Sequence, residues 1–245
     1  MIELNGQKIL ILGASGFIGR QAAIKLSKLG ANVIISGRNE EKLQDTFSKL
    51  EGNGHHARLF DIKDLDNIQE FLKNIVDIDG EKISGLVYCN GIATIRPLKT
   101  TTSDFLHDMM ITNYYAFIEM VKRFSDKRIC TKNASIVALS SYASNYGDKG
   151  QLAYSATKAA MDSSITIIAK ELYPKGIRIN SIRPAALLPE EINFDDLPLS
   201  IQELITNMKT GPINPVNIAE EIAFLISKCS DGITGKCLDV KGYLQ

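Results

Sequence analysis

A tyrosine and a lysine four positions apart, in Tyr154-Ser-Ala-Thr-Lys158, suggest acid-base chemistry. In a helix, two residues with this spacing lie on one face. An isolated phenol has a pKa of about 10 and is a poor catalyst at neutral pH, but a nearby ammonium stabilises the phenolate and lowers that pKa. The pair therefore predicts proton transfer by Tyr154, although the same spacing is also common on solvated helix faces.

Ser140 and Ser141 follow the apolar residues 135–139, which are typical of a buried strand. Beyond a strand end, beside the helix, a serine hydroxyl can donate a hydrogen bond to a carbonyl oxygen on which negative charge develops. The sequence has no G-x-S-x-G elbow, so these serines do not indicate a hydrolase triad. The three histidines lack the spacing of metal ligands, so they are interpreted as structural or solvated and no metal site is predicted.

A glycine-rich segment lies between the apolar residues Lys8–Leu12 and residues 18–29, whose apolar side chains recur with helical spacing. Glycines at a strand exit permit a tight turn, and backbone N–H groups can then approach a pyrophosphate at the positive end of the helix. A glycine-rich turn that binds nothing has the same pattern. The residues expected at the pyrophosphate are Gly13, Ser15, Gly16, Phe17, Ile18 and Gly19.

The end of the next apolar run, residues 32–36, bears on the choice of dinucleotide. A site for NAD(H) usually presents a carboxylate there to the ribose hydroxyls, whereas a site for NADP(H) omits it and offers a cation to the 2′-phosphate. Gly37 has no side chain and Arg38 follows it, with Arg20 as a second available cation. The pattern favours NADP(H) over NAD(H), unless both arginines are ordinary solvated charges.

Short β-branched runs alternate with longer amphipathic stretches, the order expected of strand–helix–strand units. The predicted strands are Lys8–Leu12, 32–36, 57–60, 85–89, 135–139, 177–182 and Cys237–Val240. The predicted helices are 18–29, 40–50, 64–76, 103–125, Leu152–Leu172 and 216–227. Strands joined by helices pair in parallel through right-handed crossovers. We therefore expect a Rossmann-type, doubly wound α/β fold: a seven-stranded parallel sheet with helices on both faces, in three layers.

The 245 residues suit one dinucleotide-binding domain, residues 1–245, because α/β folds of this length are often undivided. Residues 185–211 interrupt the alternation with prolines, one weakly amphipathic stretch (201–208) and four acidic residues close together at positions 190–196. They follow a strand end, and ligands bind beyond the carboxyl ends of such strands, so the segment is predicted to be a substrate lid. The four acidic residues are Glu190, Glu191, Asp195 and Asp196.

Composition excludes several classes of partner. Lys+Arg 28 balances Asp+Glu 28, so no electrostatic field gathers nucleic acid or an anionic membrane. No apolar run approaches the roughly 18 residues of a membrane span. The four cysteines lie far apart without CxxC pairs, which fits reduced intracellular thiols. A soluble cytoplasmic protein is expected.

Nearly the whole chain resembles the short-chain dehydrogenase/reductase family, in its compact single-domain branch. Many ordered matches are more specific than any one motif. The matching landmarks are the glycine loop, Asp61-Ile62, Cys89-Asn90-Gly91, Asn113, Ser141, Tyr154-x-x-x-Lys158, the segment from Ile177 through Asn180 to Pro184, and Ile233-Thr-Gly235.

The resemblance implies hydride transfer between C4 of a nicotinamide and a carbonyl or alcohol carbon. Tyr154 would donate the proton to the carbonyl oxygen in reduction, and Ser141 would orient that oxygen. Lys158 would hold the nicotinamide ribose hydroxyls and lower the Tyr154 pKa, and Asn113 would support a water chain that resupplies the proton. The other residues implied at the cofactor are Asp61, Ile62, Asn90, Gly91, Ile182 and Pro184.

Three departures from the family pattern fall within the cofactor site. The middle loop glycine is Gly16, and Phe17 occupies the usual glycine position. Tyr88-Cys89-Asn90-Gly91 replaces Asn-Asn-Ala-Gly, and Pro184-Ala185 replaces Pro-Gly, with Pro189 or a shifted loop in place of the usual threonine. Loop length is unchanged, so the pyrophosphate site is expected to persist, while the nicotinamide end is the most altered.

Reductases of fatty-acid synthesis resemble this chain throughout, so a 3-oxoacyl thioester on acyl carrier protein is the favoured substrate. They dock that acidic carrier on basic residues at the positions of Lys132 and Lys175, which otherwise are solvated charges. An acidic lid on the same side would repel the carrier. Because pocket shape selects the substrate, a sugar, polyol, steroid or other secondary alcohol stays open, as does a dinucleotide sensor without turnover. The resemblance also implies a homodimer or homotetramer formed through residues 103–125 and Leu152–Leu172.

Overall fold

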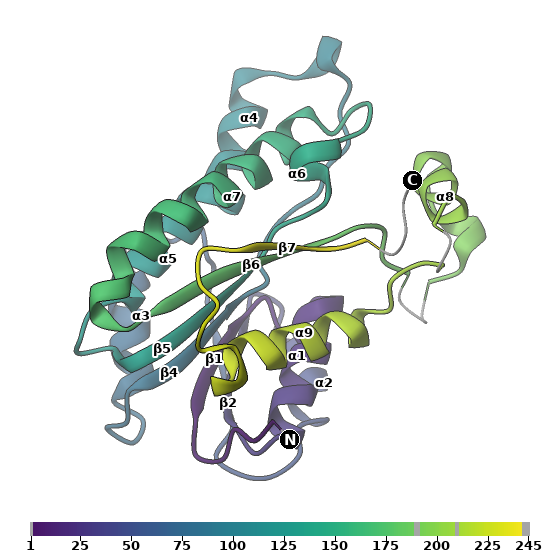
Figure 1. Ribbon diagram of the computed structural model, residues 1–245. Helices are drawn as coiled ribbons and strands as arrows, with labels where there is room; N and C mark the ends of the chain where they lie inside the picture. Colours follow the sequence, from purple (N-terminus) through teal and green to yellow (C-terminus); the bar gives the residue numbers. More distant parts are fainter. Residues whose placement is uncertain (1, 189–191, 209–210, 242–245) are drawn as a thin grey trace.

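The computed structural model describes residues 2–188, 192–208 and 211–241. Within these residues seven parallel strands form one sheet in the order β3-β2-β1-β4-β5-β6-β7 (Figure 1). The strands are β1 (Lys8–Leu12), β2 (Asn32–Gly37), β3 (His56–Leu59), β4 (Ile83–Tyr88), β5 (Cys130–Leu139), β6 (Arg178–Pro184) and β7 (Cys237–Val240). The longer helices are α1 (Phe17–Lys28), α2 (Glu40–Phe47), α3 (Ile68–Val76), α4 (Ser103–Met110), α5 (Ala116–Phe124), α7 (Leu152–Leu172), α8 (Leu199–Thr206) and α9 (Pro215–Ile226).

The sheet is covered by helices on both faces, which explains why its strands are almost continuously apolar. In β1, Leu10 and Leu12 pack into the core formed with α3, α5 and α7, whereas Ile9 and Ile11 pack into the core formed with α1 and α9. Figure 1 shows these two groups of helices on opposite sides of the strands. The predicted doubly wound, three-layer fold is confirmed.

The strand order reverses direction between β1 and β4, which lie side by side in the middle of the sheet. β1, β2 and β3 extend to one side of this point and β4 to β7 extend to the other. At such a switch point the loops at the carboxyl ends of the strands diverge and leave a crevice for a ligand. The glycine loop after β1 and the residues after β4 therefore meet at the crevice.

Several predicted boundaries differ from the structure by one to five residues, and two of the differences have a clear local reason. The expected helix 103–125 is divided by a π-helical turn, η2 (Ile111–Tyr115), which inserts extra residues between α4 and α5. β5 begins five residues earlier than expected, at Cys130. The polar residues Thr131, Lys132 and Asn133 do not have the apolar pattern of a buried strand, so the sequence did not predict its start. The short helix α6 (Ala143–Tyr146), which follows Ser141, was not expected.

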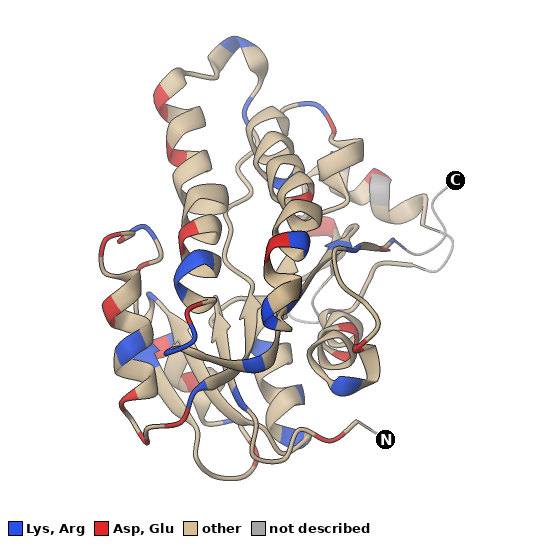
Figure 2. Ribbon diagram, turned by 60° about the vertical axis from the view of Figure 1, so that its left-hand side comes forward, with Lys and Arg blue, Asp and Glu red and all other residues tan. Residues whose placement is uncertain are grey.

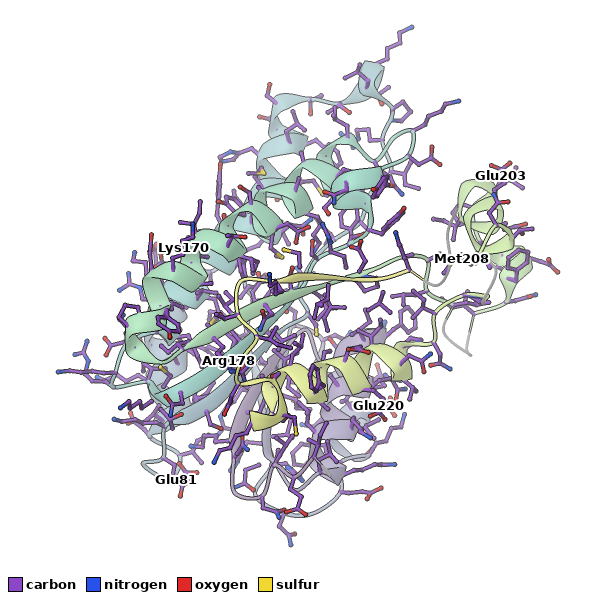
Figure 3. The ribbon with its side chains drawn as sticks, in the orientation of Figure 1. Glu81, Lys170, Arg178, Glu203, Met208 and Glu220 are labelled. Carbon is purple, nitrogen blue, oxygen red and sulfur yellow. The ribbon has the colours of Figure 1, made fainter. Side chains whose placement is uncertain are left out.

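The segment after β6 leaves the sheet before α9 returns to it. Leu187 forms a parallel bridge with Ile213, while Ile205 and Met208 pack into the core on the α1 and α9 face. Figure 3 shows Glu203 and Met208 on this excursion, the part of the chain between β6 and α9, far from Glu81 at the opposite end of the strands. Three residues of the predicted lid, Pro189, Glu190 and Glu191, lie outside the described residues.

Charges of both signs are interspersed along the ribbon in Figure 2, as the balanced composition requires. No face in that view is dominated by one sign. None of the helices in the described ranges combines the length and apolar composition needed to cross a membrane.

Candidate active site

Ser141, Tyr154 and Lys158 meet at the carboxyl edge of the sheet. Ser141 follows β5, and the other two lie one turn apart on α7, as the spacing predicted. The Ser141 and Tyr154 side chains share a hydrogen bond, and the Lys158 Nζ lies 5.9 Å from the centre of the Tyr154 ring. Residues separated by 17 positions in the sequence are thus assembled by one strand end and one helix.

Lys158 is held deep in the protein, with 3% of its surface exposed. Its Nζ donates a 2.6 Å hydrogen bond to the backbone carbonyl of Leu139, the last residue of β5. Burial lowers the pKa of Lys158 to about 8, while Asp162 and Cys89 act in the opposite direction. Desolvation penalises the charged form of a buried lysine, so its charge depends on the few groups around it.

Tyr154 does not have the lowered pKa that its neighbour led us to expect. Burial raises its pKa above the ordinary value, and the hydrogen bond with Ser141 partly offsets this effect. The expectation that Lys158 lowers this pKa is wrong for the protein as described, because the ammonium faces the ring and donates to Leu139. Tyr154 therefore carries its proton at neutral pH, which suits a proton donor.

Asn113 lies in the π-helical turn η2 and is fully buried. Its Nδ2 donates to the Ile92 carbonyl at 2.9 Å and to Thr157 Oγ1 at 3.1 Å, and its Oδ1 accepts from the Ile92 N–H at 2.8 Å. The side chain thus clamps the loop after β4 against α7. Its part in a water chain stays a prediction, and any such contact would use its backbone.

The glycine loop forms a cradle that added side chains would fill. Gly13 has φ +76°, and a Cβ there would lie 2.7 Å from Asn90 Oδ1 and 2.9 Å from the Cys89 carbonyl carbon. A Cβ on Gly19 would lie 2.3 Å from the Gly13 carbonyl oxygen. α1 begins directly after Gly16, so its free N–H groups open toward this loop.

Asn90 supplies independent support for a ligand at this place. Its Oδ1 is buried without a hydrogen-bond partner among the described residues, which is costly unless a donor arrives. Phe17, at the altered glycine position, is half exposed and leaves the cradle open. Gly91 adjoins Lys158, because a Cβ there would lie 3.3 Å from Lys158 Nζ. The residues present therefore fit a dinucleotide, whose hydroxyl groups could donate to Asn90 Oδ1 and whose phosphates could accept from the N–H groups of the glycine loop.

The end of β2 has little room for a carboxylate. A Cβ on Gly37 would lie 2.8 Å from Ser15 Oγ. Arg38 is exposed, and its Nη1 lies 3.8 Å from Asp61 Oδ2, so two residues predicted to bind the cofactor are neighbours. The Arg20 guanidinium is paired with Asp45 at 2.8 Å and is directed toward α2. Arg38 is consequently the more available cation of the two.

Three further residues predicted at the cofactor, Ile62, Pro184 and Ile18, lie in three different settings. The side chain of Ile62 is buried in the core beneath α3, so only its backbone could meet an adenine, while Asp61 beside it is exposed. Pro184 ends β6, and its carbonyl accepts a hydrogen bond from the Tyr142 N–H at 2.9 Å. Ile18, in the first turn of α1, packs against the core and is partly buried.

A cavity of about 430 Å³ opens beside two of the side chains predicted to be catalytic, Ser141 and Tyr154. Ser141, Tyr154 and Pro184 line it, together with the Tyr142 and Tyr146 rings, which stack at 4.5 Å. Ile201 of α8 contributes to the wall, so the excursion after β6 reaches the site. Sequence reasoning missed the two tyrosines, whose only signal was their place directly after the serine strand.

The comparisons with known proteins agree with this geometry. A family model described as enoyl-(acyl carrier protein) reductase matches residues 13–243. The chain belongs to the short-chain dehydrogenase/reductase family, so it is an oxidoreductase of the class that uses a nicotinamide dinucleotide.

Curated relatives match the chain from end to end. The 3-oxoacyl-[acyl-carrier-protein] reductase FabG of Rickettsia bellii (strain RML369-C) is 34% identical, covering 99% of this chain and 98% of the relative. The enzyme of the same name from Buchnera aphidicola is 30% identical, covering 98% of each. The fold also matches the crystal structure of a protein assigned as a short-chain alcohol dehydrogenase from Sinorhizobium meliloti 1021, with a TM-score of 0.88, 23% identity, and 98% and 97% coverage.

Proposed function

We propose that this protein is an NADPH-dependent reductase of 3-oxoacyl thioesters carried by acyl carrier protein. The observation that carries the proposal is that Ser141 and Tyr154 line one cavity, while Lys158 lies between the Tyr154 ring and Gly91 of the loop after β4. Full-length similarity to two enzymes named 3-oxoacyl-[acyl-carrier-protein] reductase supports the choice of substrate.

The proposed mechanism divides the work among three side chains. When bound, NADPH supplies the hydride that reduces the carbonyl carbon. Ser141 donates a hydrogen bond that orients the carbonyl oxygen, and Tyr154 donates its proton to that oxygen as negative charge develops. Lys158 contributes a fixed positive charge and hydrogen-bond donors at the cofactor ribose. The elevated pKa of Tyr154 keeps the proton in place until it is needed.

One wall of the cavity is apolar and fits an acyl chain, while Asp148 and Gln151 add polar groups elsewhere in the lining. Besides Ser141 and Tyr154, the wall around α8 and the end of β6 is formed by Ala185, Ala186, Leu187 and Ile201. A sugar would leave several hydroxyl groups unpaired against such apolar side chains, which costs binding free energy. We propose that the described part of the predicted lid, residues 185–188, 192–208 and 211, covers the bound acyl chain.

The basic residues expected to dock the carrier lie at the amino ends of the strands, opposite the carboxyl ends where Ser141 lies. Lys132 and Lys175 both line a cavity of about 840 Å³ at the amino ends of β5 and β6. Ten-residue β5 spans about 30 Å between that cavity and Ser141. In our proposal a carrier docked there presents its substrate to the catalytic edge of a second copy of the chain. The exposed Asp195 and Asp196 belong to the excursion after β6, away from this cavity on the same chain.

Reversing both docking charges, in the double variant Lys132→Glu/Lys175→Glu, is expected to raise the KM for a carrier-bound 3-oxoacyl substrate about tenfold. The kcat/KM for a small free thioester such as acetoacetyl-N-acetylcysteamine should not change, because the catalytic edge is untouched. A matched double reversal elsewhere, Lys28→Glu/Lys228→Glu, serves as the control. Equal effects of the two double variants on the carrier-bound substrate would remove the docking role.

Arg38→Asp is expected to lower the preference for NADPH over NADH by about 10- to 100-fold. The change removes the exposed cation offered to the 2′-phosphate and replaces it with a repelling carboxylate. The preference is measured as the ratio of kcat/KM for the two dinucleotides. Lys28→Asp, at the far end of α1, controls for a general change of charge. If Arg38→Asp leaves the ratio of kcat/KM for NADPH and NADH unchanged, Arg38 does not bind the 2′-phosphate.

The proposed activity is tested by mixing the protein with NADPH and acetoacetyl thioesters and following the loss of NADPH absorbance. Ketones related to sugars, polyols and steroids complete the panel. We expect the thioesters to have the highest kcat/KM. A higher value for another ketone would reassign the substrate, and tight NADPH binding without turnover of any ketone would favour a sensor.

A further inference from the structure

A carboxylate lies behind the catalytic lysine and has no part in the mechanism above. Tyr154, Lys158 and Asp162 follow one another at intervals of four residues on α7, so all three share one face of that helix. Only 10% of the Asp162 side chain is exposed. A carboxylate so withdrawn from water is rare unless its charge is used or compensated.

Asp162 is only partly satisfied by its neighbours. Its Oδ1 accepts a 3.0 Å hydrogen bond from Ser181 Oγ on β6. Its Oδ2 is buried, accepts no hydrogen bond from the described residues and lies 3.8 Å from Arg183 Nη1. The Arg183 guanidinium is drawn away by Asp239 on β7, whose Oδ1 lies 2.7 Å from Arg183 Nε. Arg183 is thus shared between two carboxylates and pairs more closely with Asp239, so it compensates the Asp162 carboxylate only in part.

We propose that Asp162 is a positioning residue for the reduction: its buried carboxylate, one helical turn beyond Lys158, holds that lysine in its cationic form. The role of the cation itself rests on the proposed function. Like-facing residues four apart on a helix have Cβ atoms about 5–6 Å apart, close enough for strong interaction where water is excluded.

The other groups around Lys158 cannot supply this charge. Cys89, directly after β4, has its thiol pKa raised to about 12 by burial, so it is neutral at working pH. On β5 the Leu139 carbonyl accepts a hydrogen bond from Nζ but carries no net charge. Tyr154, on the same helix, keeps its proton. Arg183 and Asp239, on β6 and β7, act on Lys158 mainly through Asp162. Burial lowers the pKa of Lys158 to about 8, and Asp162 opposes that decrease.

Asp162→Asn tests the proposal because it removes the charge and keeps an oxygen for Ser181. In protein labelled with ¹³C at the lysine Cε, the Lys158 resonance is assigned with Lys158→Arg and followed against pH. We expect its titration midpoint to fall by about one unit in Asp162→Asn, a tenfold change in the acid dissociation constant. Asp239→Asn, which removes the other carboxylate beside Arg183, is the control and should shift the midpoint by less than half as much.

Arg183→Met gives an opposite expectation and stays informative if Asp162→Asn does not fold. Removing the guanidinium leaves the Asp162 charge wholly uncompensated, so the Lys158 midpoint should rise. Unchanged midpoints in whichever of the two variants folds would overturn the proposal and leave Asp162 an anchor for β6. The titration requires neither dinucleotide nor substrate, so it decides this role even if no ketone is reduced. In a protein that does reduce ketones, the alkaline limb of kcat/KM should move in the same direction as the midpoint, and a limb that stays in place would contradict the proposal.

Discussion

Tyr154→Phe is expected to lower kcat about 10³-fold while the Kd for NADPH stays within about twofold of the wild type. The substitution removes only the phenol oxygen, so the ring remains packed and the cavity keeps its shape. What is lost is the proton that the carbonyl oxygen requires, together with the hydrogen bond to Ser141. Stopped-flow or steady-state turnover gives kcat, and fluorescence titration gives the Kd.

A tyrosine on the same side of the sheet provides a matched control. Tyr114 Oη makes a 2.8 Å hydrogen bond with Ser164 Oγ on α7, so Tyr114→Phe removes the same kind of interaction outside the cavity. Its kcat should remain close to that of the wild type. A Tyr154→Phe enzyme within tenfold of the wild type would defeat the proton-donor role, because another acid of the cavity, such as Tyr142 or Tyr146, would then have to supply the proton.

Lys158→Met is expected to lose both functions of the lysine, with kcat/KM reduced by 10³-fold or more and NADPH affinity reduced at least tenfold. The substitution removes the buried cation and leaves the Leu139 carbonyl without its donor. Because that orphaned carbonyl also destabilises the fold, the thermal midpoint must be measured beside the kinetics. A folded Lys158→Met protein with wild-type kcat/KM would contradict the account.

The direction of the pH dependence follows from the same lysine. Burial lowers the pKa of Lys158 to about 8, so the side chain is cationic below this pH and neutral above it. Tyr154, with its pKa raised by burial, keeps its proton to higher pH, so it does not determine how kcat/KM changes just above pH 8. The kcat/KM for reduction should therefore decrease about tenfold per unit above pH 8, and the limb should be absent from the residual activity of Lys158→Met.

The sequence predicted the parts of the site that depend on local spacing. The Tyr154 and Lys158 pair shares a helix face because its spacing matches the helical repeat, and Gly13 and Gly19 are glycines because the turn has no room for Cβ atoms. The seven strands were recognisable because strands buried on both faces are almost wholly apolar. Each of these features depends on residues that are close together in the sequence.

Features that depend on tertiary packing were not predictable in the same way. The direction of the Tyr154 pKa depends on how deeply the phenol is buried, which no spacing records. The π-helical turn at Ile111–Tyr115 leaves the apolar pattern nearly intact, so the break between α4 and α5 was invisible. In the sequence, Arg20 and Arg38 were both candidate cations for a 2′-phosphate. In the structure Arg20 forms an ion pair with Asp45, which directs its guanidinium toward α2.

Transfer of deuterium from cofactor to substrate tests the central claim most directly. The protein would be incubated with NADPH deuterated at both C4 positions and with an acetoacetyl thioester, and the product analysed by mass spectrometry and NMR. We predict a 3-hydroxybutanoyl thioester with one deuterium at C3 in the wild type, and about 10³-fold less in Tyr154→Phe. Product without deuterium at C3, or no product while NADPH is bound, would contradict reduction by hydride transfer at this site.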